Sequence, residues 1–145
     1  MLIYNVIIGT ISSIKTRDNI LSTKAILISA NDSKAVNEVC QKSLESSKAL
    51  DIVSIEVKEH SSITDIMMIA TGTSNRHVCA IADRLVDHLS LHGIHGVRVS
   101  GTEEGKWVLV DIGSVIVHIM QEADRERYQL ETLYKAVAAG ISEWE

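Results

Sequence analysis

KWVLVDIGSVIVHIMQEADRERYQLETLY, residues 106–134, contains the patterns that indicate the class of the fold most clearly. Two apolar runs rich in β-branched residues, 107–110 and 115–120, flank a turn that contains Gly113, and this pattern predicts a β-hairpin. Neither run alternates cleanly between apolar and polar residues, so we expect both faces of each strand to be covered. The hairpin is therefore predicted to lie in the core of a sheet and not at its edge.

An amphipathic helix is predicted directly after the hairpin. Leu130, Leu133, Tyr134 and Val137 recur at helical spacing and form the stripe that would pack on the sheet. The opposite face is expected to be solvated, because it carries only polar residues: Glu122, Arg125, Glu126, Gln129 and Thr132.

The segment before the hairpin predicts another helix and two strands. Ser33 is expected to cap a helix that ends near Ala49. Residues 51–57 alternate between apolar and polar, and residues 65–70 are wholly apolar after Asp65, which indicates two strands. Their short link leaves no room for a helical crossover, so we expect them to pair antiparallel.

The clearest helix runs from about Ser74 to His92. Its apolar stripe has helical spacing, and Gly93 just past its end is typical of a left-handed cap. The turn at Gly72 before this helix could bind an anion, but Ser74 is better interpreted as an N-cap. With a short strand at 96–99, these elements predict an α/β fold with a mixed sheet of about five strands flanked by helices.

Composition indicates a single domain, and its net negative charge argues against electrostatic binding to nucleic acid. The 145 residues are 46% hydrophobic and carry a net charge of −5, which argues against a broad grip on phosphate backbones. No apolar run approaches the roughly 20 residues that cross a bilayer. Cys40 and Cys79 lie on predicted helix stripes and lack a C-x-x-C spacing, so we expect buried free thiols in a reducing compartment.

Residues 1–32 show no sustained periodicity. An extra strand or helix, a targeting segment, and residues upstream of the true start codon all remain open as accounts of them. We interpret them as an N-terminal extension on which no function rests, followed by a domain at 33–140 and a tail at 141–145.

The chain resembles the ribosomal silencing factor family, also called the Iojap family, from about Lys34 to Ala138. The upstream segment of the likeness is ITDIMMIATGTSNRHVCAIAD, residues 63–83. The downstream part is an ordered series: Trp107, Asp111, Gly113, His118, Arg125, Tyr128, Leu130, Glu131 and Leu133. The chain departs from the family at three positions: Ser114 for a usual Asp, Tyr134 for a usual Trp, and Arg127 for a usually apolar residue.

This resemblance implies a fold similar to that of nucleotidyltransferases and an activity without catalysis. Members of the family dock on a large-subunit ribosomal protein at the intersubunit face and keep the small subunit from joining, which represses translation when nutrients are short. The resemblance thus implies a cytoplasmic protein with a ribosomal partner and no cofactor. We expect a monomer or weak homodimer, with no membrane contact and no sequence-specific contact to nucleic acid.

The fold makes a nucleotidyltransferase-like enzyme or a nucleotide-binding protein the alternative. Nucleotidyl transfer needs carboxylates that converge on metal ions, yet glycine stands at the second position of Asp111-x-Gly113. His88 and His92 have a spacing used by zinc sites, but histidines near a helix end are favoured without metal. His118 is expected to be a hydrogen-bonded core residue, because no nucleophile accompanies it. We therefore predict no catalytic, cofactor or metal site.

Aromatic and acidic residues near the hairpin are the candidates for partner contact. Trp and Tyr are enriched at binding hot spots, and core filling is about equally compatible with Tyr128. Acidic side chains beside Trp107 would steer a basic ribosomal protein surface. The predicted partner-binding residues are Glu103, Glu104, Trp107, Asp111 and Tyr128.

Overall fold

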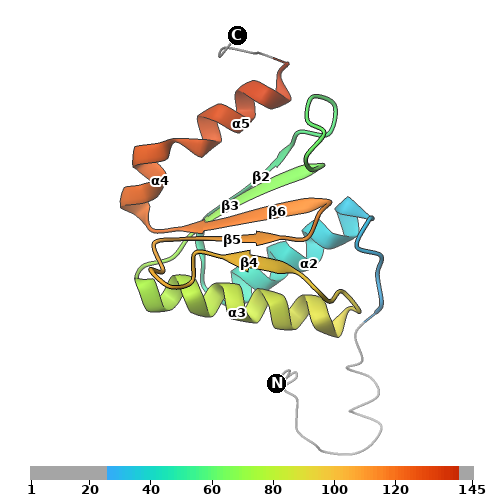
Figure 1. The fold of residues 1–145 in the computed structure, drawn as a ribbon, viewed down its shortest axis with the longest axis horizontal. Coiled ribbons are helices and arrows are strands. Elements are labelled where there is room, and N and C mark those ends of the chain that lie inside the picture. The colour runs from blue at the N-terminus through green and yellow to red at the C-terminus, as the bar shows by residue number, and fades with distance from the viewer. Residues whose placement is uncertain (1–25, 141–145) are drawn as a thin grey trace, which may run out of the picture.

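The computed structural model describes residues 26–140 and is built around two central parallel strands. β3 (Ile66–Thr71) and β6 (Val115–Met120) are buried along their whole lengths. They lie at the centre of a five-stranded sheet in the order β2-β3-β6-β5-β4. Figure 1 shows helices on both sides of this sheet, which confirms the predicted mixed α/β architecture.

Two antiparallel pairs extend the central strands outward. β2 (Leu50–Glu56) pairs with β3 as expected from their short link, and the register shifts at a bulge between Leu50 and Val53. β5 (Trp107–Asp111) pairs with β6 as the predicted hairpin, and β4 (Arg98–Ser100) closes the far edge.

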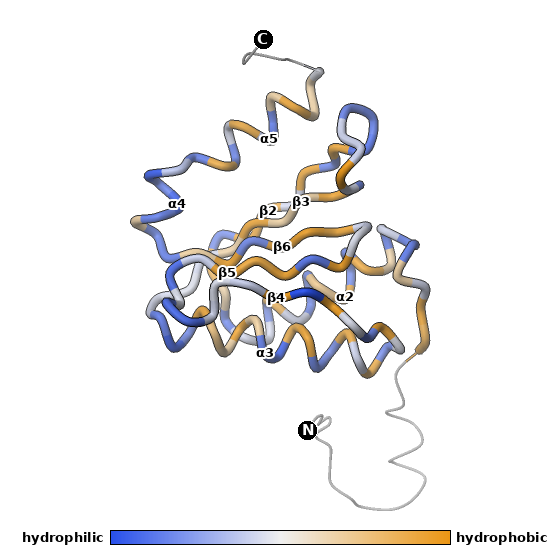
Figure 2. The backbone as a smooth tube through the Cα atoms, viewed as in Figure 1, coloured by the Kyte–Doolittle hydropathy of each residue, from blue (hydrophilic) through white to orange (hydrophobic). Residues whose placement is uncertain are grey.

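Helices α2 (Ser33–Ser46) and α3 (Asn75–Leu91) cover one face of the sheet together. The predicted stripe of α3 is buried at Val78, Ile81, Ala82, Leu85 and Leu89. Figure 2 shows hydrophobic residues concentrated in the strands and recurring along both helices. The cap of α2 is Asp32 and not Ser33, because an Asp32 carboxylate oxygen accepts from the Ala35 backbone N–H at 3.1 Å.

The turn that enters α3 serves packing and capping. Ser74 Oγ accepts from the His77 backbone N–H at 3.0 Å, so Ser74 is the predicted N-cap. A Cβ on Gly72 would lie 2.7 Å from Val78 Cγ2, which explains the glycine as a close approach of the turn to the helix. At the other end Gly93 has φ +89° and continues the chain past the last helical turn, as predicted.

The segment after the hairpin forms two helices and not the single predicted one. α4 (Glu122–Tyr128) and α5 (Leu130–Ala138) meet at Gln129, which adopts the left-handed conformation at φ 49°. Neither glycine nor proline marks this break, so it could not be predicted from the residue types. Of the predicted stripe, Leu130 is buried, whereas Leu133, Tyr134 and Val137 are half-buried.

Arg125 was expected on the solvated face of this helix, and that expectation is wrong. Its side chain is only 8% exposed, because Nε donates to Glu131 at 2.9 Å and Nη1 donates to the Thr71 hydroxyl at 2.8 Å. A buried guanidinium is tolerated only with such partners. Arg125 thereby joins α4 to α5 and to β3.

The prediction that both faces of the hairpin are covered holds for β6 and is wrong for β5. Val108 and Val110 are buried against the α2–α3 side, but Trp107, Leu109 and Asp111 on the opposite side are partly exposed. Figure 1 shows the reason, because α4 and α5 extend over β2 and β3 and leave β5 and β4 uncovered.

Residues 26–32 belong to the folded unit. The Ile28 backbone N–H donates to the His92 carbonyl at 3.0 Å, and Ser114 Oγ donates to the Ala30 carbonyl at 2.6 Å. Ile28 and Ala30 also pack against the main core. Residues 1–25 and the tail at 141–145, for which the sequence suggested an extension and a short end, lie outside the described residues.

We predict that Leu85→Ala lowers the free energy of unfolding by about 2 to 5 kcal/mol, because Leu85 is fully buried and its truncation leaves a cavity. Urea denaturation measures the change. The matched control is Leu91→Ala on the same helix, where the side chain is 47% exposed and the loss is expected to stay below about 0.5 kcal/mol. Equal midpoints for the two variants would contradict the packing of α3.

We also predict that a chain beginning at Ser33 is less stable than one beginning at Ile26. The shorter chain loses the Asp32 cap, which alone contributes about 1 kcal/mol, together with the packing of Ile28 and Ala30. Thermal unfolding followed by circular dichroism compares the two. A shared melting temperature would show that residues 26–32 do not stabilise the domain.

Candidate functional site

The uncovered half of the sheet carries apolar side chains where a solvated strand would carry polar ones. Trp107 and Leu109 project from β5 on this face and are half-buried. Leu109 lies beside Ser100 of the edge strand in the sheet register. A face without a helical layer that still presents apolar groups is typical of a contact surface for another macromolecule.

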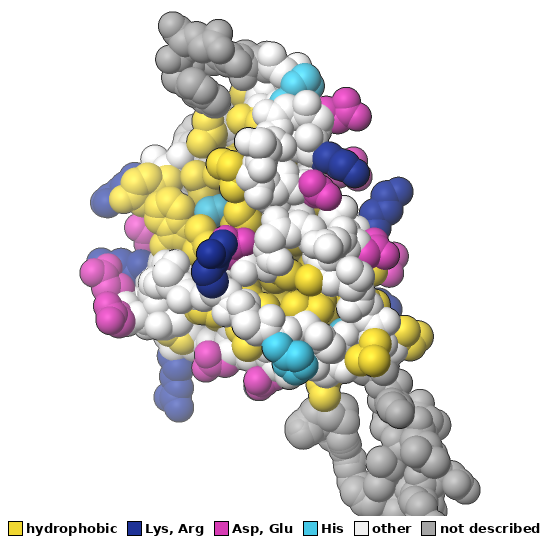
Figure 3. All heavy atoms as spheres, turned by 45° about the vertical axis from the view of Figure 1, so that its right-hand side comes forward, with side chains coloured by type: hydrophobic (Ala, Val, Ile, Leu, Met, Phe, Trp, Pro, Cys, Tyr) yellow, Lys and Arg dark blue, Asp and Glu magenta, His cyan; other side chains and the backbone are white. Residues whose placement is uncertain are grey.

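A hollow of about 440 Å³ adjoins this face. Trp107 and Tyr128 line it, and their rings lie 5.0 Å apart between centroids at an angle of 42°. Glu103 and Glu104 also line it, and both are exposed to solvent. The structure thus brings together four of the predicted residues. Figure 3 shows one side of the molecule, on which hydrophobic side chains gather in patches between charged groups.

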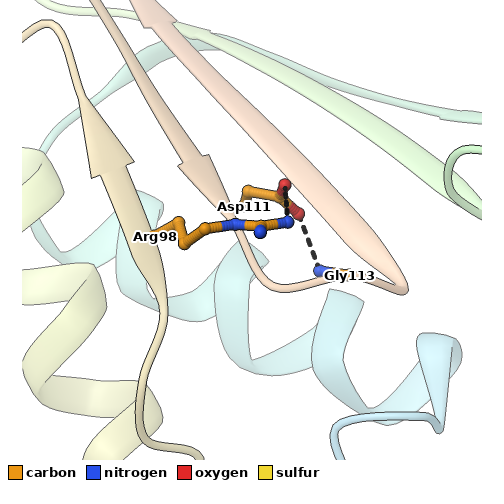
Figure 4. A network of polar contacts seen from close by, with 3 residues as sticks. All are labelled: Arg98, Asp111 and Gly113. Carbon is orange, nitrogen blue, oxygen red and sulfur yellow. Dashed lines mark hydrogen bonds and ion pairs between the residues drawn. The ribbon is translucent and has the colours of Figure 1, made fainter.

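The fifth predicted residue, Asp111, does not lie beside the other acids as expected. It stands at the opposite end of β5 from Trp107, about 13 Å along the strand. Its carboxylate accepts from Arg98 Nη2 at 3.0 Å and from the Gly113 backbone N–H at 2.9 Å (Figure 4). Asp111 therefore stabilises the β5–β6 turn and pairs with the exposed cation of β4.

His118 lies on the neighbouring strand β6, on the same face of the sheet as Trp107, and is 4% exposed. The Trp107 indole N–H donates to His118 Nδ1 at 3.0 Å, which confirms the predicted core histidine with a hydrogen-bonded neighbour. On its other side the Tyr134 ring lies 6.0 Å away between centroids. Burial lowers the pKa of His118 to about 4, so the ring is neutral near pH 7.

The residues considered for catalysis are not assembled into a metal centre. Glu103 and Glu104 are separated from Asp111 by the length of β5, and residues 26–140 contain no group of three potential ligands placed to hold a metal ion. His88 Nδ1 lies 2.7 Å from Ser43 Oγ, and His92 Nδ1 donates to the Ile26 carbonyl at 2.6 Å. Both histidines thus connect α3 to neighbouring segments.

Several residues of the hollow were not predicted. Lys106, Asp124 and Arg127 line it together with the aromatic pair, and Leu109 extends the apolar surface along β5. Leu109 could have been found from its two-residue spacing to Trp107, which places both on one face of a strand. The helix residues could not, because their position depends on the break at Gln129.

The two cysteines differ in environment. Cys40 is fully buried, and burial raises the pKa of its thiol to about 12. Cys79 is only half-buried, and its Sγ donates to the Thr102 carbonyl at 3.3 Å. Both are free thiols as expected, but only Cys40 has the predicted burial.

We predict a pH dependence of stability that arises from His118. The unfolded chain binds a proton at this residue below pH 6.5, whereas the folded chain stays neutral down to about pH 4, so the free energy of unfolding falls as the pH drops through this window. From pH 7.5 to 5 the loss at this residue is about 2 kcal/mol. Urea denaturation should show this loss in the wild type and in His95→Asn, which alters an exposed histidine. In His118→Asn the loss should be smaller by this amount, and the part that comes from the burial-lowered pKa of His88 should remain. The same pH dependence in all three proteins would contradict the neutral, buried histidine.

Comparisons with known proteins agree on one family. The family model described as "Ribosomal silencing factor during starvation" matches residues 30–143. Ribosomal silencing factor RsfS of Haemophilus influenzae is 44% identical over 100 residues, which are 69% of this chain and 98% of that protein. A crystal structure of a Chromobacterium violaceum protein matches with a TM-score of 0.70 at 36% identity, covering 72% of this chain and 87% of that one.

A relative from mouse, "Mitochondrial assembly of ribosomal large subunit protein 1", is 36% identical over 94 residues, or 63% of this chain and 41% of that protein. Plant relatives include a mitochondrial and a chloroplastic Iojap protein, so the compartment varies between relatives. No helix in residues 26–140 has both the length and the apolar character that a membrane crossing requires. The match over most of the sequence and the shared fold establish that this chain belongs to the ribosomal silencing factor family.

Proposed function

We propose that this chain silences ribosomes by occupying the face of the large subunit that the small subunit must reach. It docks on a protein at the intersubunit face, and its own volume then excludes the small subunit, so translation falls under nutrient limitation. The family's description, which names starvation, and the mouse relative's name, which refers to the large subunit, both support this proposal. The cytoplasm is the proposed site of action.

The observation that carries the proposal is the uncovered half of the sheet. Trp107, Leu109 and Tyr128 expose apolar surface there, whereas α2 and α3 cover the other face of the sheet. Aromatic side chains that are rigid and partly exposed are the residues that most often dominate binding energy. A contact of roughly 800 Å² per partner suffices for a specific complex.

Charge favours a protein partner over bare RNA. The chain carries a net charge of −5, and the exposed acids Glu103 and Glu104 stand at the rim of the aromatic hollow. These acids would repel phosphate groups and attract a basic protein surface, which raises the rate of association and fixes the orientation of docking. Asp111 belongs to the proposed surface through its pair with Arg98 at the far end of β5.

We predict that Tyr128→Ala weakens binding to purified large ribosomal subunits by fivefold or more, because a hot-spot aromatic contributes more than about 1 kcal/mol. Sedimentation through sucrose gradients, with and without small subunits, measures both binding and subunit joining. The matched control is Leu91→Ala, because Leu91 and Tyr128 are similarly exposed, at 47% and 48%, and Leu91 lies on the other helical layer. Equal binding by the two variants would place the interface elsewhere.

A charge reversal tests the acidic rim separately. Glu103→Lys with Glu104→Lys should slow association at low salt and leave the thermal midpoint unchanged, because exposed acids contribute little to folding. The difference from wild type should shrink as salt rises. Ser74→Ala is the control, since it removes the cap of α3 and should leave docking intact. Faster association of the reversed variant would exclude a basic partner at this rim.

A further inference from the structure

Four rings from four different elements form a continuous row beside the proposed docking surface. Tyr128 of α4, Trp107 of β5, His118 of β6 and Tyr134 of α5 follow one another with centroid separations of 5.0, 5.9 and 6.0 Å. The row runs from a half-exposed tyrosine at the surface to the buried histidine and then to the underside of α5. His118 is its only member that is both polar and almost fully buried.

The hydrogen bond between Trp107 and His118 fixes the state of the histidine. An indole N–H can only donate, so His118 Nδ1 accepts, and the neutral ring must carry its proton on Nε2. That Nε2 is buried, and it has no hydrogen-bond partner within residues 26–140. A buried donor without a partner disfavours the folded state, so an aliphatic side chain of similar size would suit core stability better.

What the histidine provides is an acceptor for Trp107. The Trp107 side chain is only half-buried, and packing alone therefore leaves its ring some freedom to turn. A hydrogen bond from the buried strand β6 holds one edge of the indole in place, while the ring continues to stack against Tyr128. Binding then loses less side-chain freedom than it would with a mobile ring.

We propose that His118 is a positioning residue, which acts through the Trp107 indole to hold the docking surface in its binding conformation. This inference rests on the proposed function, because it takes Trp107 as part of the ribosome-binding face. It assigns His118 no direct contact with the partner, since its side chain is almost fully buried.

The test compares two substitutions of His118. His118→Leu removes the acceptor and the unpaired donor together, whereas His118→Asn can place a carbonyl oxygen where Nδ1 stands. We expect His118→Leu to remain folded with a midpoint no lower than that of His118→Asn, yet to bind purified large subunits two- to tenfold more weakly than the wild type. His118→Asn should bind like the wild type. Wild-type affinity of a folded His118→Leu would overturn the inference.

Fluorescence reports on the indole without any ribosome. Trp107 and Trp144 are the two tryptophans of the chain, so a Trp144→Phe background leaves Trp107 as the sole indole emitter. In that background His118→Leu should shift the emission to longer wavelength, because the released indole N–H turns towards water, and His118→Asn should not. An unchanged spectrum for His118→Leu would overturn the positioning role even if binding were weakened.

A double-mutant cycle separates the inference from the proposed function. Trp107→Phe keeps a ring but lacks the N–H, so adding His118→Leu to it should cause less than a twofold further loss of binding. A full additional loss would overturn the inference, because His118 would then act by another route. If instead Trp107→Ala folds and binds large subunits normally, the proposed docking face fails, while the fluorescence result still decides whether His118 orients the indole.

Discussion

The parallel pairing of β3 and β6 is the constraint on which the structure depends. Six register pairs, from Ile66 with Val115 to Thr71 with Met120, join two strands that are buried on both faces. Strands buried in this way need a layer of other residues on each side, and here the layers differ. α2 and α3 form a complete layer with the larger core cluster, whereas α4 and α5 form a narrower one around Ile69, Met120 and Leu130.

The path of α4 and α5 across the sheet follows from the contacts of one buried cation, Arg125. Arg125 reaches Thr71 on β3 and Glu131 on α5, so its two contacts draw α4 and α5 towards the β2 side of the central strands. The left-handed residue Gln129 lets the two helices meet at the angle that these contacts require. Because a buried guanidinium without partners would destabilise the fold, this arrangement is strongly held. β5 is left uncovered as a consequence.

Most of the fold was predictable because periodicity reports directly on burial. The α3 stripe, the cap at Ser74, the β2–β3 pair and the hairpin all followed from local patterns. The break at Gln129 and the burial of Arg125 were not predictable, since a glutamine in the left-handed region and an arginine with distant partners carry no local signal. The candidate site was likewise predictable only in part. Trp107 and Tyr128 were proposed from their residue types, whereas the separation of Asp111 from Glu103 depends on strand length and pairing.

An apolar run can thus have two causes that the sequence does not distinguish. β6 lacks polar alternation because both its faces are buried by the protein itself. β5 lacks it for a different reason, because Trp107 and Leu109 on its open face are apolar although they are only half-buried, Trp107 at the margin of the α4–α5 layer and Leu109 beyond it. An uncovered apolar strand is a liability for a protein that acts alone, but it becomes a specific surface when its side chains are held in fixed positions. In this chain the Trp107 indole N–H donates a hydrogen bond to His118, and the Trp107 ring packs against Tyr128. These two contacts order the partly exposed indole before any partner binds. The function proposed above relies on occupied volume and not on chemistry, and an ordered contact surface is the property that such docking would require.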